Sequence, residues 1–227
     1  MATHSVRLMV MVLIGVLAFV GLPLLSWGIS DVGGFLLDPA RLLYCVAVPI
    51  LQIAAALLLP GAGMDRGTGD KTVERQRIAA RLMLALSLAI MVVGPYCDRR
   101  GIASLPGNDL CRYAGLALFA LGFGVMIWAT ACLGKQFSIQ VTLQKDHQLV
   151  TDGPYRFVRH PRYFGILVFL AGSSLLFRSR LALILVVAMA MVLTWRIHDE
   201  EKLMRTAFQA EWEVYAQRTR RLIPFVF

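Results

Sequence analysis

Two clusters of ionisable and aromatic side chains lie between long apolar runs in the last third of the chain. The first is the proline-punctuated stretch 153–163, GPYRFVRHPRY, and the second is RIHDEE at 196–201, directly after the last apolar run. Ionisable groups are costly to place at the edge of a hydrocarbon layer, so two such clusters predict a functional site where they meet. We therefore expect the chemistry of this protein in its last third.

Prolines shape the first cluster. Pro154 and Pro161 restrict φ and lack a backbone N–H, which predicts an extended or turned segment between them. Pro161 is also suited to the first position of a helix, so His160 is expected at a rigid corner. A histidine beside a proline often has a structural role, yet its aromatic and basic neighbours favour a ligand-binding wall. These neighbours are Tyr155, Arg159, Arg162 and Tyr163.

The second cluster places Arg196 and Glu200 four residues apart, on one face of a helix. As an ordinary ion pair they would contribute only a few tenths of a kcal/mol. Alternatively, Arg196 offers a planar fork to an anion and Glu200 offers a carboxylate to a cation. Their position at the end of an apolar run favours the functional interpretation.

The elements that position these clusters are predicted to be membrane helices. The chain is 58% hydrophobic, has a mean hydropathy of +0.66 and is only 16% charged. Four apolar runs approach the ~20 residues that cross a bilayer, and two shorter runs follow. The fold class is thus all-α and polytopic, with about six transmembrane helices. The runs are Val6–Gly28, Leu42–Leu59, Ile78–Tyr96, Tyr113–Leu133, Tyr163–Phe177 and Leu181–Trp195.

The net charge of +9 is explained by membrane topology. No basic stripe interleaved with aromatics lies outside the apolar runs, so a nucleic-acid partner is not expected. With the N-terminus inside, 17 of the 23 basic residues fall in inner segments and 6 in outer ones. The positive-inside rule then places both termini and both polar clusters on the cytoplasmic face.

Two segments outside the spans are expected to serve the site. The loop 134–162 is long and mixed in polarity, and an ordered loop of that size usually carries function. The tail 199–221 has apolar residues at helical spacing with charges between them, which predicts a cytoplasmic amphipathic helix.

The four cysteines show no metal-ligand spacing, and we expect no metal site. Cys45 and Cys132 lie in apolar runs and are most simply small core residues. Cys97 and Cys111 flank a loop that the topology places outside. Either they form a disulfide in an oxidising compartment or they remain free thiols at helix ends.

Several motifs, taken together, resemble the isoprenylcysteine carboxyl methyltransferase family. They are GPY at 153–155, RHPRYFG at 159–165, EE at 200–201, the aromatic pair Phe208 and Tyr215, and IPF at 223–225. The resemblance covers roughly Trp128–Phe227 and implies a membrane enzyme that uses S-adenosylmethionine. Phospholipid methyltransferases are relatives of that family. A Gly-x-Gly at 122–124 resembles one of their motifs, although paired glycines in a span are typical of helix packing.

The resemblance also implies roles for single residues. Arg196 matches the residue that orients the acceptor, and His160 is a candidate base if the acceptor is an amine, as is Glu201. The implied cofactor-binding residues are Gln140, His147, Gln148, Leu149, Val150, Tyr155, His160, Pro161, Arg162, Tyr163, Glu200 and Glu201. The chain then divides into scaffold helices at 1–110 and a methyltransferase core at 111–227. The core comprises the cofactor loop 134–162, a helical hairpin 163–197 and the amphipathic helix 199–221.

Three functions stay open. The first is methyl transfer from S-adenosylmethionine to a lipid-like acceptor that enters from the bilayer, such as the carboxylate of an isoprenylcysteine. The second is a phospholipid N-methyltransferase or a sterol-type membrane reductase. The third is a non-catalytic membrane scaffold or transport component. The sequence presents no decisive general base, which favours a carboxylate or thiolate acceptor.

Overall fold

The computed structural model describes residues 2–59, 74–107, 109–134 and 149–223. Within these ranges the regular structure is helical, apart from two isolated β-bridges, which confirms the predicted all-α class. The elements are α1 (Ala2–Val16), η1 (Leu17–Gly21), α2 (Leu22–Trp27), η2 (Ile29–Asp31), α3 (Val32–Leu36), α4 (Pro39–Leu58), α5 (Glu74–Arg100), α6 (Asp109–Leu133), η4 (Gly153–Arg156), α7 (Pro161–Leu176) and α8 (Arg180–Arg218).

Five of the described helices are long and apolar enough to cross a membrane. They are Leu8–Trp27, Pro39–Leu58, Gln76–Arg100, Asp109–Leu133 and Arg180–Arg218. The remaining predicted span corresponds to α7, whose 16 residues fall short of the ~20 that a straight crossing needs. Large side chains such as Ile14 and Ile184 remain 61% exposed, as expected for a surface that faces hydrocarbon.

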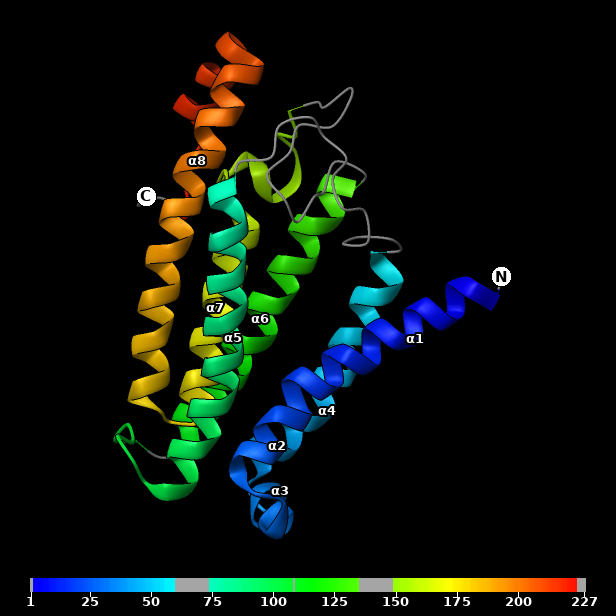
Figure 1. Cartoon of the computed structure of the whole chain (residues 1–227), viewed down its shortest axis with the longest axis vertical. Helices are drawn as coiled ribbons and strands as arrows, with labels where there is room; N and C mark the ends of the chain where they lie inside the picture. Colours follow the sequence, from blue (N-terminus) through cyan, green and yellow to red (C-terminus); the bar gives the residue numbers. More distant parts are fainter. Residues whose placement is uncertain (1, 60–73, 108, 135–148, 224–227) are drawn as a thin grey trace.

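The long helices run alternately in opposite directions (Figure 1). The start of α5, the end of α6, the start of α7 and the C-terminal part of α8 all lie at one end of the molecule, drawn at the top. We call it the site end, because it carries residues 149–163 and 196–223. Both polar clusters of the sequence are therefore brought to the same end of the helices.

Helices α6 and α7 approach each other at backbone distance through glycines. A Cβ on Gly122 would lie 2.3 Å from the backbone N of Phe169, and one on Gly115 would lie 2.4 Å from that of Leu176. Gly124 has no neighbour within 4 Å of such a Cβ. Of the two interpretations of the 122–124 motif, the structure supports helix packing for Gly122.

A buried ion cluster holds the opposite end together. Asp98 accepts hydrogen bonds from Arg41 at 2.9 Å and from both terminal nitrogens of Arg112 at 2.8 Å, and Arg112 Nε lies 3.0 Å from Asp38. These charges come from α4, α5 and α6, so the cluster fixes three helices to one another. Cys97 lies beside it in sequence, and all four cysteines, including Cys97 and Cys111, are free thiols.

Helix α8 combines the last span with the helix that follows it. It begins after Ser179, whose side chain accepts from the N–H of Ala182, and it continues without a break through residue 199, where the sequence predicted a new helix to start. The break falls instead at Gln209, with φ 45° and ψ −114°. Beyond it the chain folds back, and Arg205 Nε lies 2.6 Å from Glu213 across the turn (Figure 1). The helix ends at Arg218, not at residue 221.

Candidate active site

The turn before α7 is held against α6. Gly153 has φ +59°, and a Cβ there would lie 2.6 Å from Sγ of Cys132, so both the backbone angle and the space favour glycine. Tyr155 is buried, its carbonyl accepts from the hydroxyl of Tyr215 at 2.8 Å, and burial raises the pKa of its own hydroxyl. Residues 157–160 form the predicted turned corner, but the residues before them form the 3-10 helix η4, which the sequence did not predict; Pro161 occupies the start of α7 as expected.

The end of the chain returns to this corner. The N–H of Arg159 donates to the carbonyl of Arg220 at 2.7 Å, and that of His160 donates to Arg221 at 3.1 Å. The N–H of Arg220 donates in turn to Phe157 at 3.2 Å. The reversal at Gln209 makes this pairing possible, because it turns the last part of α8 back toward α7.

Glu201 is the centre of an ion cluster that joins the corner to the tail. Its Oε1 accepts from Arg159 Nε at 2.9 Å, and its Oε2 accepts from Arg221 Nε at 3.0 Å. Arg159 also donates to the carbonyls of Ala216 and Thr219. Both carboxylate oxygens are thus engaged by arginines, and Glu201 is 9% exposed. This arrangement holds the corner and the tail in place.

Glu200 faces a different set of partners. Its Oε1 accepts from Arg196 Nε at 2.9 Å and from the hydroxyl of Tyr163, and that hydroxyl also accepts from Arg196 Nε at 2.7 Å. Its Oε2 lies 3.6 Å from Nδ1 of His160, which is longer than a normal hydrogen bond. The Glu200 side chain keeps 16% of its surface exposed, whereas that of Arg196 keeps 5%. Glu200 is therefore a carboxylate whose Oε1 is fixed by two donors, while its Oε2 faces His160.

His160 lies between the two neighbouring glutamates. Its ring is stacked on that of Tyr163, with centroids 5.7 Å apart and an angle of 10°. Nε2 is 3.5 Å from Glu201 Oε1 and makes no hydrogen bond with the described residues. The stacked pair forms an aromatic wall next to Glu200, which suits a flat or cationic group.

The structure thus brings together most of the residues that the sequence selected. Tyr155, His160, Pro161, Arg162, Tyr163, Arg196, Glu200 and Glu201 lie at the site end, and Leu149 and Val150 lead into the turn at Gly153. Gln140, His147 and Gln148 lie outside the described residues. The roles of Arg221 and Thr219 were not predicted from the sequence, where the only hint of them is the concentration of basic residues at 218–221.

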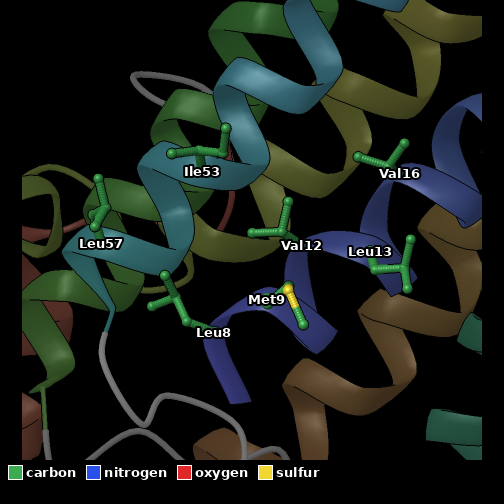
Figure 2. A pocket seen from close by; sticks show the side chains of 7 residues that line it. All are labelled: Leu8, Met9, Val12, Leu13, Val16, Ile53 and Leu57. Atoms are coloured by element: carbon green, nitrogen blue, oxygen red, sulfur yellow. The ribbon is translucent and has the colours of Figure 1, made fainter. Parts of the chain in front are cut away.

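A separate apolar hollow lies between α1 and α4. It has a volume of about 540 Å³ and is lined only by aliphatic side chains and a methionine (Figure 2). They are Leu8, Met9, Val12, Leu13, Val16, Ile53 and Leu57. None of the predicted site residues that the structure describes lines this apolar hollow.

Comparisons with known proteins identify the relatives of this chain. The family model described as the isoprenylcysteine carboxyl methyltransferase family matches residues 115–206. A probable protein-S-isoprenylcysteine O-methyltransferase of Oryza sativa subsp. indica is 32% identical over 172 residues, covering 73% of this chain and 87% of the rice protein. The chain belongs to this family. Membership makes it a membrane methyltransferase and disfavours the reductase and scaffold interpretations.

Other relatives match a shorter part of the chain. The protein-S-isoprenylcysteine O-methyltransferase of Saccharomyces cerevisiae is 32% identical over 122 residues, covering 52% of this chain and 51% of its own length. A nickel-cobalt-cadmium resistance protein of Alcaligenes xylosoxydans is 30% identical over 125 residues, covering 54% and 58%. In the part of the chain that the structure describes, no group of three or more histidine, cysteine or acidic side chains is arranged to hold a metal ion.

Proposed function

We propose that this protein transfers a methyl group from S-adenosylmethionine to the carboxylate of an isoprenylcysteine-like acceptor. The observation that carries the proposal is the buried triangle of Arg196, Tyr163 and Glu200 at the edge of the apolar helices. A carboxylate held by two donors on one oxygen, with the other facing an aromatic wall, suits an ammonium group. The names of the relatives support the acceptor class.

The residues present fit the proposed cofactor. Oε2 of Glu200 would hold its amino group, and the stacked rings of His160 and Tyr163 would lie against its adenine or sulfonium. Backbone groups near Leu149 and Val150 would bind its polar edges. When bound, S-adenosylmethionine supplies a methyl group on a positively charged sulfur. Further proposed contacts are those of Tyr155, Pro161, Arg162, Gln140, His147 and Gln148.

Arg196 would orient the acceptor. A carboxylate is ionised at neutral pH and would need no general base to accept a methyl group, so the contribution of these residues would be alignment and exclusion of water. The guanidinium is already fixed by Glu200 and Tyr163, which reduces the entropy lost when an acceptor binds. We assign Glu201 to positioning of the corner and tail, because Arg159 and Arg221 bind both of its oxygens.

The same proposal includes an orientation in the membrane. The site end would face the cytoplasm, as the distribution of basic residues predicts. A water-soluble cofactor would then enter from the loop side, and a prenylated acceptor would enter laterally from the bilayer, between the helices.

The test is methyl transfer by the purified protein in detergent or nanodiscs. Labelled S-adenosylmethionine should transfer its methyl group to an S-farnesylated cysteine derivative, and the product should be a base-labile methyl ester. A phosphatidylethanolamine acceptor should remain unlabelled. Base-stable label in the phospholipid, with none in the farnesylated acceptor, would overturn the carboxylate assignment.

A further inference from the structure

Gln76 is a buried polar residue at the start of α5, outside residues 115–206 that match the family model. It is 4% exposed, and its Nε2 donates to Oδ2 of Asp199 at 3.1 Å. Its carbonyl oxygen, Oε1, is buried and accepts no hydrogen bond from any residue that the structure describes. A buried amide oxygen without a donor is costly, so this atom calls for an explanation.

Asp199 determines which way the amide of Gln76 points. An ionised carboxylate only accepts hydrogen bonds, so the NH₂ group of Gln76 must face it and Oε1 must face away. Asp199 is adjacent to Glu200 and three residues after Arg196, and residues three apart share a helix face. Gln76 therefore binds α8 within one helical turn of Arg196.

The location of Gln76 favours the acceptor over the cofactor as its ligand. Gln76 lies on α5, a helix that packs against both α7 and α8, whereas η4, which leads from the predicted cofactor loop, packs against α6. In an isoprenylcysteine, the carbon that bears the carboxylate also bears the amide N–H, so donors and acceptors for these two groups must lie close together.

We propose that Oε1 of Gln76 accepts a hydrogen bond from the amide N–H of the acceptor cysteine, while Arg196 binds its carboxylate. The proposal rests on the proposed function and adds a positioning residue from the helices that the sequence predicted to be scaffold only. This hydrogen bond would make the enzyme selective for acceptors in which the carbon that bears the carboxylate also bears an amide N–H.

Two acceptors test the proposal on the full-length protein. N-acetyl-S-farnesyl-L-cysteine has the N–H, and 3-(farnesylthio)propanoate lacks the acetamido group. Gln76→Met should lower kcat/KM for the first acceptor by about two- to tenfold, the range for one hydrogen bond, and leave the second nearly unchanged. The Kd of S-adenosylmethionine should stay within twofold. Ile78→Met, at a 51% exposed position on the same helix, is the matched control and should leave both acceptors unaffected.

Asp199→Asn provides a second variant that keeps the size of the side chain. An asparagine can donate to Oε1, so the Gln76 amide is free to turn, and the selectivity for the N–H acceptor should fall here too. If Gln76→Met leaves the ratio of the two kcat/KM values unchanged, whether neither value falls or both fall equally, the proposal is overturned. A weaker Kd for S-adenosylmethionine would assign Gln76 to the cofactor instead. If the wild-type protein methylates neither acceptor, the proposed function itself fails.

Discussion

Replacing Arg196 by lysine tests whether this side chain orients the acceptor. In the structure its Nε donates to Glu200 at 2.9 Å and to Tyr163 at 2.7 Å, and a guanidinium carries five N–H donors in one plane. Lysine keeps the charge but concentrates its donors on one nitrogen at the end of a flexible stem. It cannot hold both partners in this geometry and also present a planar fork.

The expected loss is about one charge-assisted hydrogen bond, roughly 1.5–3 kcal/mol. Because about 1.4 kcal/mol corresponds to a factor of ten in rate, kcat/KM for a farnesylated carboxylate acceptor should fall by about ten- to a hundredfold. Affinity for S-adenosylmethionine should change little, since Glu200 and Tyr163 remain in place. The assay pairs calorimetric titration of the cofactor with initial rates over a series of acceptor concentrations.

Tyr163→Phe is the companion variant, because it keeps the aromatic wall and removes one partner of Arg196. It should show a smaller loss in the same direction. If Arg196→Lys weakens cofactor binding as much as turnover, then the arginine has been assigned to the wrong ligand. Full activity of Arg196→Lys would reduce the arginine to an ion-pair partner of Glu200.

Three further predictions concern the cofactor and the fold. Glu200→Gln should abolish detectable S-adenosylmethionine binding by calorimetry with an unchanged melting temperature, and retained affinity would remove Glu200 from the cofactor site. Gly122→Ala should destabilise the protein by about 3 kcal/mol in thermal melts, because the new Cβ meets the α7 backbone, whereas Gly124→Ala, with open space around it, should be neutral or stabilising. Gln209→Gly should raise stability by about 1 kcal/mol, because glycine accepts a φ of 45°. The control is Gln217→Gly. Because Gln217 lies at an ordinary helical position, this variant should lower the stability of the protein. Equal effects of the two variants would contradict backbone strain at Gln209.

The sequence alone determined the membrane class, the approximate spans and the family. Hydropathy is a local property, and a run such as Tyr113–Leu133 is helical in a bilayer whichever neighbours it has, because its backbone polar groups must pair within the segment. The motif at 159–165 also carries its own information, since Pro161 restricts the backbone before any packing occurs. These features needed no tertiary contacts to be recognised.

Tertiary structure decided which charges lie in the proposed site and which hold the fold together. Glu200 and Glu201 are neighbouring residues of the same type, but the side chains of adjacent residues on a helix point about 100° apart. One therefore meets Tyr163 and His160, while the other meets Arg159 and Arg221 from a tail that returns only because the helix breaks at Gln209. The bond between Gln76 and Asp199 likewise joins residues 123 positions apart. Pairings of this kind depend on how α5, α7 and α8 pack, and no local pattern encodes that packing.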